Sequence, residues 1–282
     1  MRLSKKFDKN ISANDWTLDI EELKSKITEK TKFILLNTPH NPTGKVFSRE
    51  ELEKIAQVAI QHDLYVLSDE VYDQIYYEDE HVRIATLPGM WERTITVGSA
   101  GKTFGVTGWR VGWLIGPSVL LKSVVATHAR TVFCVATPLQ EAVARGFEEA
   151  MKNNYFQKQR DLYRKQRDYL VKVFEKLNLP VAITRGSYFL MVNTDKLDLK
   201  GVEAVKWEEK SDPNAMEPHD YTVCRWLTTE IGVTAIPPSS FYDESNYDLA
   251  KHLARFCFCK TDETLEEASK RLEKLSAFIS QE

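Results

Sequence analysis

The sequence predicts an α/β protein, with a mostly parallel sheet wrapped by helices and a smaller α+β domain after it. Short apolar runs alternate with amphipathic helical stretches through the first half of the chain, which is typical of strand–helix–strand units. After about residue 150 the order changes to one long, charged helix and then shorter elements. The 282 residues suffice for one large domain or two ordinary ones. We therefore expect a large domain over residues 1–152 and a small C-terminal domain over residues 153–282, with Tyr155–Leu177 as a bridging helix.

Four apolar runs in the first half predict the strands of the larger sheet: Lys32–Leu36, Leu64–Leu67, Thr94–Val97 and Trp109–Ile115. A helix is expected after the first run, because Ser48 and Glu51 form a capping box ahead of an apolar stripe that begins at Leu52. Two more helices are expected at Val119–Ala129 and Leu139–Met151. Parallel strands are buried on both faces, so each run needs cover on both sides.

The second half predicts a mixed set of shorter elements. Strands are expected at Tyr188–Val192, Val233–Ile236 and Leu253–Cys259, and helices at Tyr221–Glu230 and Leu265–Ile279. Asp195–Asp220 is polar and contains two prolines, which predicts an irregular surface excursion.

Composition excludes several classes of protein. With 38 basic and 41 acidic side chains the formal charge is −3, so no nucleic-acid-binding face is expected. No apolar run is long enough to suggest a membrane span, and residues 1–10 lack the apolar core of a secretory signal. We expect a cytoplasmic protein, with a mitochondrial location as the alternative.

The four cysteines (Cys134, Cys224, Cys257 and Cys259) form no paired CxxC clusters, so no metal site is expected. Cys257 and Cys259 alternate with phenylalanines, which is typical of a buried strand. We interpret them as structural thiols rather than as redox or metal-binding groups.

Polar clusters follow three of the predicted strands, at residues 37–44 (NTPHNPTG), 68–72 (SDEVY) and 99–110 (SAGKTFGVTGWR). In open α/β sheets, ligands bind at the carboxyl ends of the strands. These clusters are therefore where a functional site is expected.

The order of these clusters resembles the class I/II aminotransferases, which are pyridoxal-5′-phosphate (PLP) enzymes of fold type I. The motif Asn-Pro-x-Gly is weak alone, but here an acid precedes a lysine and the lysine precedes an arginine, and RFCF at residues 255–258 resembles a fourth element. The segments NTPHNPTGKV and PGMWERTITVGSAGKTF resemble those of one branch of the family, which contains kynurenine aminotransferase, glutamine transaminase K and cysteine-S-conjugate β-lyase. The resemblance runs from about Asp15 to the last helix.

The resemblance implies that Lys102 holds PLP as a Schiff base and then moves a proton to and from the substrate. A primary amine is the group that this chemistry needs. Taken alone, Lys102 would be read as a surface lysine. Its place in a Gly/Ser-rich turn after a buried strand favours the functional reading.

Three further residues are implied to contact the PLP ring. Asp69 would face the pyridine nitrogen and keep it protonated, although its position also suits a helix N-cap. Tyr72 and Asn41 would hydrogen-bond the 3′-oxygen, and Asn41 also suits the turn before Pro42.

Anionic groups need donors, and the resemblance implies that Ser99 and Arg110 bind the phosphate. Gly105 stands where close relatives often have serine, which removes one hydroxyl near the phosphate. Arg255 would bind the substrate α-carboxylate, to which Asn41 would lie close. The alternative for Arg255 is a surface ion pair, which contributes little.

The sequence departs from the family at its start. Family members carry a segment before the position of Asp15 that supplies a glycine-rich phosphate-binding turn, an aromatic that stacks on PLP and residues for the partner subunit. We expect the 282-residue chain to leave apolar sheet surface exposed and to bind PLP weakly without such a segment.

The expected function is PLP-dependent transamination between an amino acid and a 2-oxo acid such as 2-oxoglutarate, within amino acid metabolism. Kynurenine, glutamine or another aromatic or sulfur-containing amino acid is the expected donor, and a homodimer is the expected assembly. One alternative is a cysteine-S-conjugate β-lyase on the same site. The other is a catalytically impaired, dimerising fragment.

Overall fold

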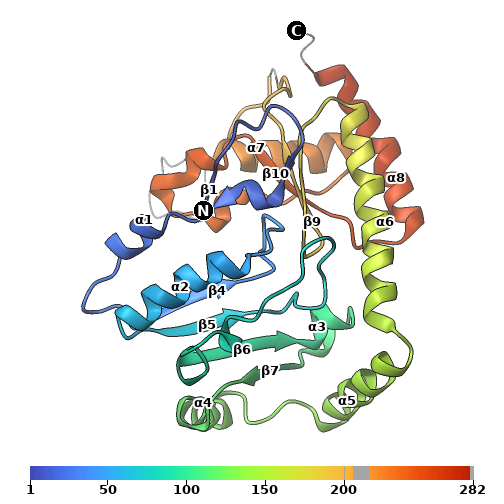
Figure 1. Cartoon of the computed structure of the whole chain (residues 1–282). Coiled ribbons are helices and arrows are strands. Elements are labelled where there is room, and N and C mark those ends of the chain that lie inside the picture. The colour runs from blue at the N-terminus through green and yellow to red at the C-terminus, as the bar shows by residue number, and fades with distance from the viewer. Residues whose placement is uncertain (200, 206–215, 280–282) are drawn as a thin grey trace.

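The computed structural model describes residues 1–199, 201–205 and 216–279. It contains the sheet predicted for the first half of the chain, which is the larger of two four-stranded sheets because its strands are longer in sum. Its four strands are ordered β4 (Phe33–Asn37), β5 (Tyr65–Asp69), β6 (Thr94–Ser99) and β7 (Gly112–Ile115). The first three are parallel, and β7 pairs antiparallel with β6. The mostly parallel sheet is confirmed, and Figure 1 shows it in the lower half of the molecule.

Helix α2 (Arg49–Gln61) covers one face of this sheet (Figure 1). The predicted capping box is formed, because the Ser48 hydroxyl accepts from the Glu51 amide and the Glu51 carboxylate accepts from the Ser48 amide. The apolar side of α2 packs with strand residues in one core that includes Leu52, Ile55 and Val66. Burial of this stripe fixes the helix on the sheet.

The opposite side chains of the strands are open to solvent among the described residues. Phe33, Leu35 and Tyr65 are 56%, 65% and 50% exposed, and they alternate with buried Leu36 and Val66. The helices in this chain therefore cover the apolar strands only in part, as expected.

The second sheet has the order β10 (Leu253–Cys257), β9 (Phe189–Asn193), β8 (Val181–Ile183) and β2 (Ile11–Ser12). Strand β2 pairs parallel with β8, so residues from the start of the chain join the C-terminal sheet. A small hairpin-like pair, β1 (Arg2–Leu3) with β3 (Trp16–Thr17), flanks it, and α1 (Ile20–Ser25) leads to the larger sheet. The division of the chain into two domains at about residue 152 remains a proposal. Residues at the start of the chain pack with the C-terminal part, because β2 belongs to the second sheet.

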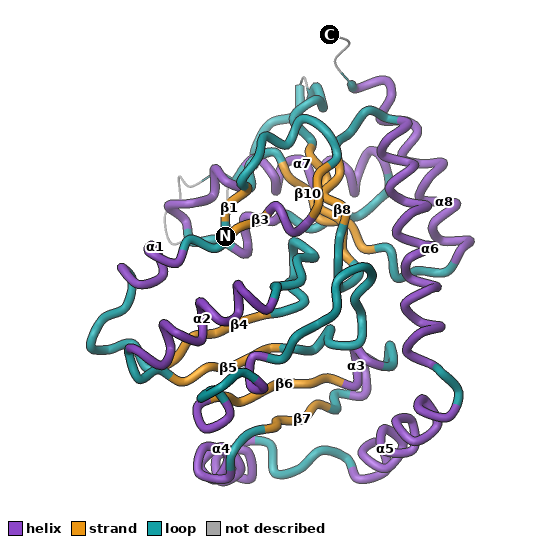
Figure 2. The backbone as a smooth tube through the Cα atoms, in the orientation of Figure 1, coloured by secondary structure: helices purple, strands orange, loops and turns teal. Residues whose placement is uncertain are grey.

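The helices that follow the first sheet along the chain are in large part as expected. Helices α4 (Ser118–Thr131) and α5 (Thr137–Lys152) precede the long bridging helix α6 (Tyr155–Lys176). Figure 2 shows α6 running from the level of the first sheet to the second, alongside α8 (Asp262–Leu272). Leu170 and Phe174 of α6 join the core formed with β9, β10 and α7 (His219–Trp226).

Four predicted elements need correction. The strand predicted at Trp109–Ile115 begins only at Gly112, because Thr107–Trp109 forms a 3₁₀ turn and Arg110 is left-handed with φ 56°. Val233–Ile236 is not a strand, since only Ile236 bridges to Arg255. The α-helix predicted to reach Ile279 ends at Leu272 and continues as a 3₁₀ turn.

The fourth correction concerns the predicted helix Tyr221–Glu230, which changes to a wider π-type turn from Leu227.

In the predicted irregular stretch Asp195–Asp220, residues 195–199, 201–205 and 216–218 contain no helix or strand. Residues 200 and 206–215 of this stretch lie outside the described residues.

Candidate active site

The carboxyl ends of three neighbouring parallel strands bring the predicted site residues to one edge of the larger sheet. Asn37 ends β4, Asp69 ends β5 and Ser99 ends β6. Asn37 and Asp69 are register partners, so their side chains leave the sheet at the same level. Helix α3 (Ala100–Thr103) follows β6 directly and places Lys102 at this edge.

Asp69 is a half-buried carboxylate. Burial raises its pKa, the hydrogen bond from the Val71 amide (3.3 Å) lowers it, and the charge of Glu70 raises it further. The charge of Lys102 acts in the opposite direction, so the two groups lie within electrostatic reach of each other. A carboxylate with a raised pKa in such a place gains from a cationic partner.

Lys102 is partly buried in the short turn of α3. The turn packs closely on the loop that follows, because a Cβ at Gly101 would lie 3.0 Å from the Thr107 Cα. Glycine is the residue that allows this approach. The turn that carries Lys102 is therefore packed against the loop after it.

Arg255 lies on β10 of the second sheet and reaches the loop that carries Asn41. Its Nη1 donates to Asn41 Oδ1 at 2.6 Å, although 214 residues separate the two in sequence. Its guanidinium lies 4.2 Å from the ring centroid of Phe189 and 5.2 Å from that of Phe241. Such stacking fixes the plane of the donor fork.

The charge of Arg255 is not neutralised by a carboxylate from the described residues. Burial lowers its pKa, because a cation is costly away from water. The surface ion pair considered above is therefore not formed by the part of the chain that the structure describes. A partly buried guanidinium of this kind is suited to an external anion.

Tyr72 is buried between aromatic rings, with its ring edge-on to Tyr188 at 5.3 Å and to Phe189 at 6.0 Å. Burial raises the pKa of Tyr72 to about 12, and both Arg255 and Asp69 act on it electrostatically. The phenol is therefore protonated at neutral pH and lies among the predicted site residues.

Ser99 and Arg110, the predicted phosphate ligands, lie on neighbouring segments, since Ser99 of β6 pairs with Gly112 of β7. The Ser99 hydroxyl caps no amide of α3. Arg110 is exposed, and its Nη1 donates to the Thr107 carbonyl at 3.2 Å. A role in phosphate binding stays a prediction for both residues.

Asn37 is a positioning residue that the sequence analysis did not single out. Its Nδ2 donates to the Asp69 carbonyl at 3.0 Å, and its Oδ1 accepts from the Asn41 amide at 2.8 Å. It therefore fixes the loop that carries Asn41 relative to Asp69. The available signal was an amide side chain in the last position of a strand, next to the polar loop.

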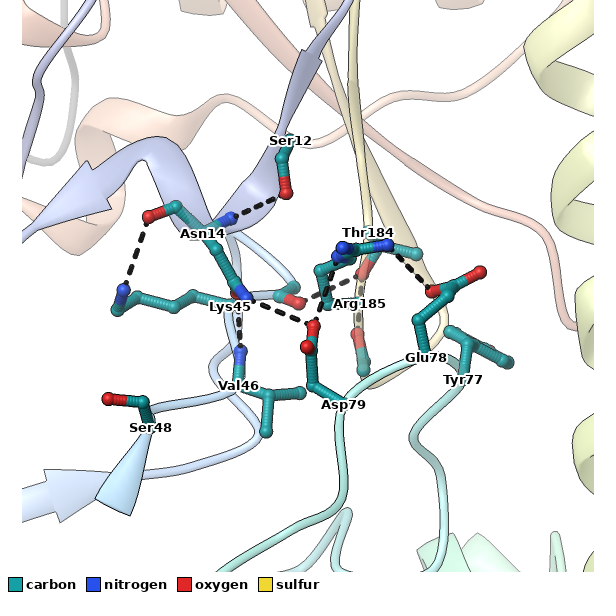
Figure 3. A network of polar contacts seen from close by, with 12 residues as sticks. Ser12, Asn14, Lys45, Val46, Ser48, Tyr77, Glu78, Asp79, Thr184 and Arg185 are labelled. Atoms are coloured by element: carbon teal, nitrogen blue, oxygen red, sulfur yellow. Dashed lines mark hydrogen bonds and ion pairs between the residues drawn. The ribbon is translucent and has the colours of Figure 1, made fainter. Parts of the chain in front are cut away.

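The far side of the same loop is held by a polar network that joins distant segments (Figure 3). Asn14 donates to Asp79 at 3.0 Å and accepts from the Val46 amide at 3.2 Å. Arg185, in the connection between β8 and β9, pairs with Asp79 at 3.0 Å and with Glu78 at 3.3 Å. Residues near the N-terminus, the loop after β4 and the C-terminal sheet are thus tied together beside the site.

Gly44 allows the loop after β4 to approach the chain that follows β8. Its φ is +73°, and a Cβ there would collide with Thr184. Gly105 has φ +70° but open space around it, which makes it a matched control.

We expect Gly44→Ala to lower the free energy of unfolding by more than Gly105→Ala. Backbone strain alone costs about 1 to 3 kcal/mol at such positions, and only Gly44→Ala adds a steric collision. Urea denaturation of both variants measures the difference. Equal losses would show that Thr184 yields without cost.

Two negative findings apply to the described residues. No group of three or more histidine, cysteine, aspartate or glutamate side chains could hold a metal ion. None of the helices combines the length and the apolar character that crossing a membrane requires.

Comparison with known proteins gives consistent matches. Residues 6–272 match the family model for aminotransferase class I and II. The chain is 45% identical over 273 residues to the kynurenine–oxoglutarate transaminase of Dictyostelium discoideum, covering 95% of this chain and 62% of that protein. It is 43% identical over 268 residues to human kynurenine–oxoglutarate transaminase 3, covering 93% and 57%.

Solved structures agree with these matches. The structure of Bna3p from Saccharomyces cerevisiae, described as a candidate kynurenine aminotransferase, has a TM-score of 0.91 and 38% identity, covering 99% of this chain and 65% of that one. The N-succinyldiaminopimelate aminotransferase of Mycobacterium tuberculosis has a TM-score of 0.79 and 34% identity, covering 92% and 62%. This chain thus spans less than two thirds of the length of these proteins.

Proposed function

Because this chain belongs to the class I and II aminotransferase family, with the PLP-dependent transferase fold type I, we propose that it transfers an amino group from an amino acid to a 2-oxo acid with PLP as cofactor. The observation that carries the proposal is Arg255, a partly buried guanidinium without a carboxylate partner among the described residues. It contacts Asn41 beside the sheet edge that carries Lys102 and Asp69. Both substrates of transamination carry a carboxylate that needs such a donor.

The donor set fits PLP. Lys102 offers a primary amine, Asp69 a desolvated carboxylate for a protonated ring nitrogen, and Tyr72 a protonated phenol for a ring oxygen. Ser99 and Arg110 offer a hydroxyl and a guanidinium for the phosphate. When bound, PLP supplies an electron sink for the negative charge that develops at the substrate Cα.

The residues of the chain then divide the work. Arg255 binds the substrate carboxylate and orients the Cα, and Asn41 holds the guanidinium in place. Lys102 removes the Cα proton and returns one as a general base and acid. Asp69 would stabilise the protonated ring nitrogen of the cofactor. A carboxylate whose pKa is raised by burial gains from a cationic partner of this kind.

The proposed substrates follow the relatives. We propose kynurenine or glutamine, or another aromatic or sulfur-containing amino acid, as donor and 2-oxoglutarate as an acceptor, and a homodimer as the assembly. The site residues equally suit β-elimination from a cysteine S-conjugate, which also begins with loss of the Cα proton. Product analysis separates the two reactions: transamination yields a new amino acid from the 2-oxo acid, whereas elimination yields pyruvate, ammonia and a thiol.

Arg255→Lys tests carboxylate binding. Lysine keeps the charge but loses the planar, two-pronged donor. We expect the KM for the 2-oxo acid to rise about 10- to 100-fold, in line with the loss of one charge-assisted hydrogen bond. Arg271→Lys, on the exposed surface of α8, is the control and should leave the KM unchanged. A KM equal to that of the parent for Arg255→Lys would place the carboxylate elsewhere.

A further inference from the structure

Two cysteines lie side by side next to the candidate active site. Cys257 ends β10, Cys259 follows two residues later, and their sulfur atoms are 3.2 Å apart. Side chains two apart on a strand share a face, so Cys257 lies on the same face as Arg255. Both cysteines are free thiols and partly exposed. Cys257 also lines a cavity of about 660 Å³ between β10 and α8, so small molecules can approach this part of the chain.

The two thiols differ in acidity because of their contact. The hydrogen bond from Cys259 lowers the pKa of Cys257 to about 7, and burial opposes this shift. The same contact raises the pKa of Cys259. The other titratable groups that act on the pair are two cations and four phenols: Arg255, Lys260, Tyr72, Tyr77, Tyr163 and Tyr188. Cys257 is thus the thiolate of the pair and Cys259 the thiol.

Although the sequence alone favours structural thiols, the contact between the two sulfur atoms leads to another role. We propose that Cys257 and Cys259 form an oxidant-reactive dithiol, in which Cys257 attacks a hydroperoxide and Cys259 resolves the product to a disulfide. The Cys257 sulfur takes the terminal oxygen of hydrogen peroxide, the O–O bond breaks, and the leaving hydroxide becomes water. Cys259 then attacks the Cys257 sulfur, the S–O bond breaks, and a second water leaves. The two thiols together supply the two electrons that reduce one peroxide.

Disulfide formation would change the surroundings of Arg255. Cys257 is the register partner of Phe189, the ring on which the Arg255 guanidinium stacks. Phe258 lies between the two cysteines, is buried, and donates its amide to the Tyr188 carbonyl. A bridge around Phe258 would shift these contacts, and we expect it to weaken carboxylate binding at Arg255. This consequence rests on the proposed function, whereas the dithiol chemistry does not.

The sequence allows a direct test. Trypsin cleaves after Arg255 and Lys260, so residues 256–260 (FCFCK) form one peptide that contains both cysteines, while Cys134 and Cys224 fall on other peptides. The reduced 282-residue chain is treated with hydrogen peroxide, blocked with iodoacetamide and digested. We expect the pentapeptide to resist alkylation and to be lighter by about 2 Da, and dithiothreitol before blocking to restore two alkylated thiols.

Two variants assign the roles. In Cys259→Ser the oxidised Cys257 has no resolving partner, so dimedone should label it as a sulfenic acid. In Cys257→Ser we expect Cys259 to stay reduced at the same peroxide concentration. In the parent chain, alkylation of the pentapeptide should be half-maximal near pH 7, as the pKa of Cys257 indicates.

Two results would overturn the proposal. One is a pentapeptide that remains fully alkylated at a peroxide concentration that oxidises exposed Cys134. The other is equal oxidation of Cys259 with and without Cys257. Weaker binding of a dicarboxylic inhibitor after oxidation, reversed by dithiothreitol, is expected in addition. Unchanged inhibitor binding with a formed disulfide would contradict only the link to Arg255.

Discussion

Lys102→Ala is expected to abolish transamination while leaving the fold intact. The variant removes the amine that holds the cofactor and moves the Cα proton, and general acid–base groups alone contribute about 10² to 10⁴ in rate. Lys102 lies in a short turn at the sheet edge and is partly exposed, so its side chain adds little to packing. Single-turnover assays with the amino donor, together with a urea denaturation curve, measure both properties.

The matched control is Lys172→Ala on the exposed side of α6, which should react at the parental rate. If Lys102→Ala turned over like this control, Lys102 would not be the catalytic amine. A variant that lost both activity and unfolding cooperativity would instead show that Lys102 has a structural role.

Asp69→Asn is expected to lower the rate by about 10² or more, because a preorganised charge at the site is lost. An amide cannot hold a ring nitrogen in its protonated form, so the electron sink is weakened. The substitution keeps the shape of the side chain and an oxygen that can accept the hydrogen bond from the Val71 amide. Asp63→Asn, on the exposed turn before β5, is the control and should retain the rate. Parental activity in Asp69→Asn would exclude this role.

The same variant should not lower the stability of the cofactor-free chain at neutral pH. Burial raises the pKa of Asp69, so the folded state binds the proton more tightly than the unfolded state does. Ionisation of Asp69 therefore destabilises the fold above its raised pKa, and this cost vanishes below about pH 4, the ordinary value for an aspartate. We expect Asp69→Asn to be at least as stable as the parent at pH 7, with the difference shrinking at acid pH. A large loss of stability at pH 7 would mean that the carboxylate is well paired.

The larger sheet was accessible from sequence because its strands are continuous apolar runs. Each ends in polar residues, and parallel strands place those ends on one edge, so Asp69 and Lys102 could be expected to lie close together. The late start of β7 could not be read in the same way. It depends on the left-handed backbone of Arg110, for which an arginine gives no signal.

Other features depend on contacts between distant segments. Strand β2 has two residues, too few for a periodic pattern, and it forms only because β8 offers a free edge. The contact of Arg255 with Asn41 joins the two sheets, and only the family resemblance suggested that these residues share a site. The predicted strand at Val233–Ile236 was wrong because four apolar residues do not distinguish a strand from buried irregular chain.

The most direct test of the proposed function is chemical labelling of Lys102. The 282-residue chain is incubated with saturating PLP, treated with borohydride, which fixes an imine between the cofactor aldehyde and a lysine, and digested for mass spectrometry. We expect a visible absorption band that borohydride bleaches, and a pyridoxyl adduct on Lys102 that is lost in Lys102→Ala and kept in Lys172→Ala. Adducts spread over exposed lysines, with Lys102 unmodified, would contradict the assignment of this site.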